Sequence, residues 1–143
     1  MIKDDFLEFL KLIELSNIQI IDSHETVMAI FPVDNGEKIQ INTEQGINKD
    51  DPIIENNIVS FRPKYNFSFS VKQKEYFRAE YVVLVSFTVK NIERFNELFS
   101  KQEVKDIFYS KQLNKTLWTI LRGTVMDAFN RHSLKPVILP FIL

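Results

Sequence analysis

The chain has 143 residues and no cysteine, and 18 Lys and Arg against 19 Asp and Glu give a formal net charge of −1. This length suits one ordinary domain with a sizeable core, and the lack of cysteine excludes disulfides, thiolate metal sites and cysteine nucleophiles. The hydrophobic share of 45% and the charged share of 26% exclude a disordered chain, and no apolar run approaches the ~18 residues of a membrane span. We therefore expect a single domain over residues 1–143, cytoplasmic and without membrane insertion.

The charges are distributed unevenly along the chain. Residues 1–60 hold twelve acids against four lysines, whereas residues 61–143 hold seven acids against fourteen Lys or Arg. A basic half is typical of nucleic-acid binding. In a domain of this size, however, the acidic half lies within a Debye length or two and cancels much of the field. We therefore predict no nucleic-acid partner.

The first third of the chain predicts a helix followed by a hairpin. Residues 4–15 carry apolar side chains at helical spacing, and two acids precede them where a helix dipole favours negative charge, so we expect a short helix or a helical lead into a strand. Residues 17–31 are rich in isoleucine and valine, residues 34–36 (Asp-Asn-Gly) are a turn signal, and residues 38–42 alternate apolar with polar. We expect the strands on either side of this turn to pair.

The middle of the chain predicts a loop and two more strands. Residues 45–57 favour turns and show no sustained period, so they form the longest expected loop. Residues 65–71 alternate apolar with polar, which is typical of a strand with one buried face. Phe67 and Phe69 on that face could stack on single-stranded nucleic acid, but core packing is the favoured interpretation. Residues 80–90 are apolar throughout their middle and predict a central strand covered on both faces.

The last third of the chain predicts a long helix and an extended segment. Apolar residues fall at helical intervals over residues 113–129, which corresponds to roughly five turns. Trp118, Met126 and Phe129 widen the apolar stripe beyond what one sheet requires, so a second packing partner is expected, with another subunit as one candidate. Residues 134–143 are too rich in proline for a helix and too apolar for a free tail. We expect this segment to dock.

No motif in the sequence predicts catalysis, a cofactor or a metal. His24 and His132 are far apart and lack cysteine neighbours, which favours solvated surface histidines. Three glycines exclude a glycine-rich phosphate loop. Asp127, His132 and Ser133 are residue types that hydrolases use, but their spacing at a helix end does not position a nucleophile and a base. Gly123 within the helix indicates either a tight helix contact or a solvent-facing position.

The order of these elements resembles that of the SecB export chaperones. Segments with the pattern of four β-strands precede a helix that contains Leu121-Arg122. An extended apolar segment with Leu139-Pro140 follows that helix. The matching stretches are residues 117–131 (LWTILRGTVMDAFNR) and 136–142 (PVILPFI). The resemblance implies an α+β fold with a four-stranded antiparallel sheet, one long C-terminal helix packed on it, a short N-terminal helix and an extended C-terminal segment. Here the crossover differs from the family pattern, and the second helix and acidic tail are missing, which puts coupling to a translocation motor in doubt.

The resemblance also implies a function in protein export. It implies a chaperone that holds non-native polypeptides in an apolar groove without nucleotide and that assembles as a homodimer or homotetramer. The alternative is a SecB-fold adaptor dedicated to one partner, as in a toxin–antitoxin–chaperone system, and a third hypothesis is a small-ligand enzyme with a cavity between sheet and helix. The candidate client-binding or interface residues are Phe67, Phe69, Phe87, Trp118, Leu134, Val137, Ile138 and Phe141.

Overall fold

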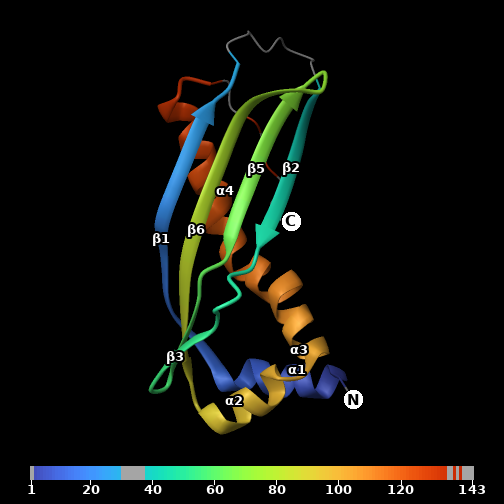
Figure 1. Ribbon diagram of the computed structural model, residues 1–143, viewed down its shortest axis with the longest axis vertical. Coiled ribbons are helices and arrows are strands. Elements are labelled where there is room, and N and C mark those ends of the chain that lie inside the picture. The colour runs from blue at the N-terminus through green and yellow to red at the C-terminus, as the bar shows by residue number, and fades with distance from the viewer. Residues whose placement is uncertain (1, 30–37, 135–136, 138, 140–143) are drawn as a thin grey trace.

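The computed structural model describes residues 2–29, 38–134, 137 and 139, and it contains one antiparallel sheet with helices packed against it. The long helix α4 crosses one face of the sheet, and the helices α1, α2 and α3 gather at the lower end (Figure 1). The elements are α1 (Ile2–Leu12), β1 (Ile13–Val27), β2 (Ile39–Gly46), β3 (Ile53–Glu55), β4 (Ile58–Phe61), β5 (Lys64–Val71), β6 (Lys74–Val89), α2 (Ile92–Phe99), α3 (Gln102–Ile107), the π-helical segment η1 (Phe108–Leu113) and α4 (Asn114–Arg131).

The long strand β6 organises the sheet. Strand β1 pairs with it along one edge, from Ile13 opposite Val89 to Val27 opposite Phe77. Strands β5 and β4 pair with successive parts of β6, so they share its other edge. Strand β2 pairs with β5, and β3 pairs with β4. Both β1 and β2 are therefore edge strands, at opposite sides of the sheet (Figure 1).

The predicted hairpin between residues 17–31 and 38–42 is wrong. Its two strands correspond to β1 and β2, which do not pair with each other but with β6 and β5. The predicted turn at residues 34–36 lies outside the described residues. Alternation identifies a strand but not its neighbour, and the 16 residues of β6 offer the 15 residues of β1 a longer pairing surface than β2 does.

The sheet has six strands, so the predicted number of four is not confirmed. The difference comes from two interruptions. Residues 62–63 separate β4 from β5, and the Pro63 carbonyl accepts a hydrogen bond from the Val83 N–H (3.0 Å). Residues 47–52 likewise separate β2 from β3. The loop expected over residues 45–57 is wrong at both ends, because residues 45–46 belong to β2 and β3 forms at residues 53–55 and pairs with β4 across a turn.

The predicted period-two strand and long helix are confirmed as β5 and α4, and the N-terminal helix is confirmed as α1. The alternating residues of β5, Phe67 and Phe69 among them, face the helices and are fully buried, as core packing predicts. The expectation that β6 is covered on both faces is wrong. Within residues 80–89 the odd-numbered side chains are buried, whereas Glu80, Val82 and Leu84 on the opposite face are only half-buried.

Aromatic side chains fill the core in two groups. The upper cluster lies between the sheet and α4, and the lower cluster lies where the sheet meets α1, α2 and η1. The upper cluster consists of Phe67, Phe69, Phe77, Tyr81, Trp118 and Phe129. The lower cluster consists of Phe6, Phe9, Phe61, Phe87, Phe95, Phe99, Phe108 and Tyr109.

Most of the wide apolar stripe of α4 is buried within its own subunit, although Met126 is half-buried and Ile120 is exposed. Trp118 packs 6.0 Å from Phe67, and Phe129 packs 4.9 Å from Phe69, measured between ring centroids. Val137 beyond the helix is buried in the same core, and the Leu139 carbonyl accepts a hydrogen bond from Arg122 Nε (3.1 Å). Trp118 and Phe129 therefore find their packing partners within the subunit, whereas a second partner for the half-buried Met126 remains a prediction.

Candidate functional site

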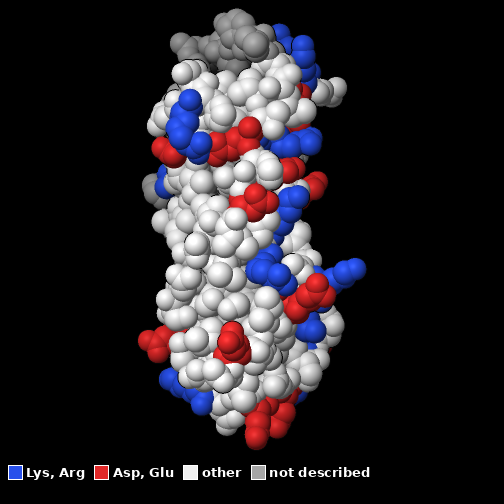
Figure 2. Space-filling model, turned by 60° about the vertical axis from the view of Figure 1, so that its left-hand side comes forward, with Lys and Arg blue, Asp and Glu red and all other residues white. Residues whose placement is uncertain are grey.

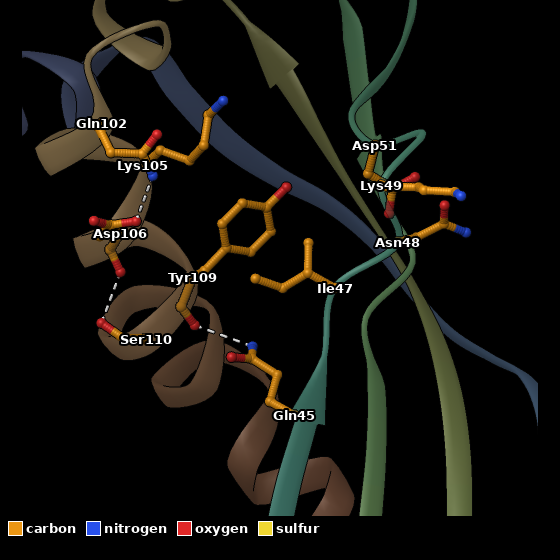
Figure 3. Close-up of a pocket in the computed structure, with 10 residues that line it drawn as sticks. All are labelled: Gln45, Ile47, Asn48, Lys49, Asp51, Gln102, Lys105, Asp106, Tyr109 and Ser110. Atoms are coloured by element: carbon orange, nitrogen blue, oxygen red, sulfur yellow. Dashed lines mark hydrogen bonds between the residues drawn. The ribbon is translucent and has the colours of Figure 1, made fainter.

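A pocket of about 490 Å³ opens between the linker at residues 47–52 and the helical segments α3 and η1. One wall comes from the end of β2 and the linker, and the other comes from the helices (Figure 3). This size is within the range of small-ligand pockets, which extends from about 300 to 1,000 Å³. The lining residues are Gln45, Ile47, Asn48, Lys49, Asp51, Gln102, Lys105, Asp106, Tyr109 and Ser110.

Hydrogen bonds accepted by two side chains of the linker, Asp51 and Asn48, fix the backbone of this wall. The Asp51 carboxylate is 1% exposed and accepts from Arg62 Nε (3.0 Å) and from the Arg62 backbone N–H. The Asn48 side chain accepts from the Asp50 N–H (3.0 Å), which closes an Asx-type turn. With the backbone fixed in this way, the linker keeps the Ile47 side chain 52% exposed beside the pocket.

The helical wall contains the π-helical turn of η1. Wider turns of this kind leave carbonyl groups without their usual helical donors, and they occur frequently at functional sites. Here the Tyr109 carbonyl accepts from Gln45 Nε2 (3.0 Å), and the Ser110 carbonyl accepts from Asn114 Nδ2 (2.9 Å). Tyr65 Oη donates to Asn114 Oδ1 (2.8 Å). This network therefore joins β2 and β5 to η1 and α4.

Tyr109 presents an unused hydrogen-bonding group to the pocket. Its side chain is buried, with 7% of the residue exposed, and its ring packs 5.7 Å from that of Phe61. The hydroxyl points into the space between α3 and the linker (Figure 3), and it has no hydrogen-bond partner within the described part of the chain. Burial, together with the charge of Asp51, raises the pKa of Tyr109 to about 12. At neutral pH the hydroxyl is therefore protonated and can donate.

The charges around the pocket do not cancel. Asp51 is paired with Arg62, and Asp106 accepts a hydrogen bond from the neutral Gln102 side chain (2.7 Å). Lys49 and Lys105 form no ion pair with any described residue, although Lys105 Nζ lies 5.4 Å from the Phe99 ring centroid. After the paired Asp51 is set aside, the pocket holds two lysines against one carboxylate. It therefore favours an anionic group beside its apolar surface.

The residues predicted from the sequence lie elsewhere. Phe67, Phe69 and Trp118 belong to the upper cluster and are buried. Phe87 belongs to the lower cluster, Val137 is buried and Leu134 is half-buried, whereas Ile138 and Phe141 lie outside the described residues. Of the predicted residues that the structure describes, none lines the pocket. A role for them in client binding or at an interface remains a prediction.

Sequence reasoning missed the pocket itself. Its linker wall comes from the segment interpreted as a plain loop, and its helical wall from a stretch before the long helix that had no predicted boundaries. The nearest signal in the sequence is the run of turn-forming residues at 48–52 directly after Ile47, but this run does not say which segment packs against the loop.

A second polar cluster is structural. Glu25 on β1 accepts from Tyr81 Oη (2.6 Å) and from both terminal nitrogens of Arg131 (2.7 Å each), and His132 Nε2 lies 3.1 Å from it. Burial raises the pKa of Glu25, but the hydrogen bonds from Arg131, Tyr81 and His132 outweigh it and hold that pKa below its usual range. The cluster fastens the end of α4 to the sheet.

The described part of the chain meets the requirements of neither a metal site nor a membrane-spanning helix. Among residues 2–29, 38–134, 137 and 139, no three His, Cys, Asp or Glu side chains are grouped so that they could hold a metal ion. None of the helices formed by these residues is long and apolar enough to cross a membrane.

Comparison with solved structures gives a match over nearly the whole chain. The Rv1957 SecB-like chaperone of Mycobacterium tuberculosis, in complex with a ChAD peptide from the Rv1956 HigA1 antitoxin, superposes with a TM-score of 0.74. The match covers 98% of this chain and 97% of the other, at 14% sequence identity. This chain has the SecB-like fold. The resemblance predicted from the sequence is thus confirmed at the level of the fold.

The remaining comparisons add no functional information. A protein of unknown function from Streptococcus agalactiae covers 90% of this chain at 12% identity with a TM-score of 0.40. The ChsH1-ChsH2 complex of Mycobacterium tuberculosis covers 48% at 14% identity with a TM-score of 0.37. No model of a known protein family and no curated protein matches the sequence. The SecB-like assignment therefore rests on three-dimensional structure.

Proposed function

We propose that this SecB-like protein is a chaperone that holds non-native polypeptide segments, without nucleotide, in the cytoplasm before export. The observation that carries the proposal is the superposition on a SecB-like chaperone over nearly the whole length of both chains. A second feature supports it. Large apolar side chains are exposed at the lower end of the sheet, on the β3–β4 hairpin and on the linker that precedes it: Ile47, Ile53, Ile54 and Ile58. Exposed apolar side chains of this kind suit contact with unfolded chains.

A dedicated adaptor is the second candidate. The mycobacterial chaperone is in complex with a peptide from an antitoxin, which favours recognition of one particular partner by a protein of this fold. In the adaptor, the same surface would bind a single sequence tightly. In the general chaperone, it would bind many sequences weakly.

Aggregation assays with several unrelated clients distinguish the two candidates. The chaperone suppresses light scattering by every unfolding client at near-stoichiometric ratios, whereas the adaptor protects one partner at most. Bovine serum albumin at the same mass concentration is the control for nonspecific crowding. If no client is protected and no peptide binds, neither candidate is correct, although the fold remains SecB-like.

Assembly into a homodimer or homotetramer is part of the proposal. Strand β1 pairs with β6 along one edge only, and within the described residues its other edge has no strand partner over 15 residues. An unpaired edge of this length offers backbone N–H and C=O groups to another strand. Figure 2, which brings the β1 side forward, shows a wide area without charged side chains, with charges along one margin and near the two ends. Light scattering of the purified chain gives the subunit number.

A further inference from the structure

We propose that the pocket between the linker and η1 selects polypeptide segments in which an apolar side chain adjoins an Asp or Glu. The inference rests on the proposed function, because it specifies which segments a polypeptide-binding SecB-like protein prefers. The apolar side chain fills the pocket, and the carboxylate lies at its rim between Lys49 and Lys105.

The apolar part of the inference follows from the inner surface of the pocket. Ile47 is 52% exposed on a linker whose backbone is fixed, and the Tyr109 ring lies opposite it as the edge of the lower cluster (Figure 3). A volume of about 490 Å³ accommodates a leucine or phenylalanine side chain together with its backbone. Burial of such a side chain also removes Ile47 from water, which favours binding.

The acidic part of the inference follows from donors that lack acceptors. Lys49 and Lys105 form no ion pair with a described residue, and the Tyr109 hydroxyl has no hydrogen-bond partner among these residues. A carboxylate is the only common group of a polypeptide that accepts hydrogen bonds and also carries the charge that two lysines favour. The carboxylates already present do not fill this role, because Asp51 is bound by Arg62 and Asp106 by Gln102.

The positions of the lysines favour a side-chain carboxylate over a chain terminus. Lys49 comes from the linker wall and Lys105 from the helical wall, and both side chains extend outward from the pocket, away from the Tyr109 ring (Figure 3). A carboxylate held between them lies at the rim, where the peptide backbone can continue in both directions. A buried terminal carboxylate would instead need cations beside Ile47 and the Tyr109 ring.

Fluorescence anisotropy with labelled peptides tests the inference. The peptides share a Gly-Ser scaffold, are amidated at the C-terminus and differ at one central pair: Leu-Glu, Leu-Gln, Leu-Lys or Ser-Glu. We expect Leu-Glu to bind about five- to tenfold more tightly than Leu-Gln, as charge-assisted hydrogen bonds predict, and Leu-Lys to bind most weakly of the leucine peptides. Ser-Glu should lose affinity because it cannot fill the apolar surface.

Variants of the protein then assign the preference to the pocket. The double variant Lys49→Gln/Lys105→Gln should bind Leu-Glu and Leu-Gln equally, whereas Lys115→Gln, an exposed lysine on α4 that does not line the pocket, should keep the preference. Tyr109→Phe keeps the ring but removes the hydroxyl, and it should weaken Leu-Glu binding about threefold or more. Ile47→Ser should weaken both leucine peptides by the same factor.

Three results would overturn the inference while leaving the proposed function in place. These are equal affinity for Leu-Glu and Leu-Gln, a preference that survives the double lysine substitution, and tight binding only of peptides with a free C-terminal carboxylate. A different result removes the proposed function itself, namely that no peptide binds and no client is protected from aggregation.

Discussion

The upper and lower aromatic clusters are built from different kinds of structural element. In the upper cluster, side chains from the regular strands β5 and β6 meet one long helix, so few elements supply many rings. In the lower cluster, rings from α1, β4, β6, α2 and η1 converge, and Phe108 alone contacts five of them at centroid distances of 4.8 to 5.9 Å. The short elements of the lower end are held by this packing together with ion pairs such as Arg94 to Glu8 and Lys101 to Asp5.

This difference bears on where a binding surface can form. In the upper cluster Phe67, Phe69, Phe77 and Phe129 are fully buried, and the cavity of about 290 Å³ beside Phe67 is lined otherwise by polar residues of β2, β5 and β6. Short elements leave gaps between them, and the pocket lies in the gap between the linker and η1. The same geometry that makes the lower end depend on a few aromatic contacts therefore gives it an accessible site.

The largest effect is expected from Phe108→Ala. Phe108 is fully buried, and its removal leaves a cavity among five rings, so the free energy of unfolding should fall by about 3–5 kcal/mol. Urea denaturation measures the loss. Phe129→Ala in the upper cluster is the matched comparison, since Phe129 is equally buried and contacts Phe69 and Phe77.

The two phenylalanine variants should differ in binding even if they lose similar stability. At a temperature where both are folded, Phe108→Ala should weaken binding of the Leu-Glu peptide, because Tyr109 packs on Phe108 at 5.7 Å. Phe129→Ala should leave that binding unchanged. Equal losses of affinity in the two variants would mean that the pocket does not depend on the lower cluster more than on the upper one.

A smaller effect is expected from Gln45→Leu, which removes the donor between β2 and η1. The Tyr109 carbonyl then loses its bond from Gln45 Nε2, and an unsatisfied buried acceptor costs about 1–3 kcal/mol. Hydrogen exchange should show faster exchange at η1 but not at the end of α4. Uniform exchange throughout the chain would contradict this local role.

Glu25→Gln removes a polar contact at the upper end, as Gln45→Leu does at the lower end. The effect of Glu25→Gln on stability depends on pH. Because the folded pKa of Glu25 is held below the ordinary value of 4.5, its contribution to stability is complete above that pH and is lost as pH falls through the folded pKa. We expect the variant to lose about 1–2 kcal/mol near neutral pH, since its partner Arg131 is well exposed, and to approach the parent protein in acid. Thermal unfolding from pH 7 to pH 3 checks this.

The same division explains what the sequence could predict. Period-two alternation in β5 and the helical stripe of α4 extend over many residues, so both elements were identifiable. The pairing of β1 with β6, the short strand β3 and the π-helical turn at Tyr109 depend on contacts between segments distant in the chain. A local pattern carries no information about such contacts, so the pocket built from them was not predictable.

The smallest effect is expected from Gly123→Ala, where the sequence left two interpretations open. A Cβ at Gly123 would have no heavy atom within 4 Å, which supports the solvent-facing interpretation over a tight helix contact. Alanine should therefore raise the free energy of unfolding by about 0.4–1 kcal/mol, since it restricts the unfolded chain and favours the helix. Gly46→Ala is the control at the lower end, where the new Cβ would lie 3.7 Å from Lys64 Cβ in a strand and gain no helix propensity. If Gly123→Ala destabilises the protein instead, this face of α4 is covered in the assembled protein, and the helix rather than the β1 edge becomes the place to look for a second subunit.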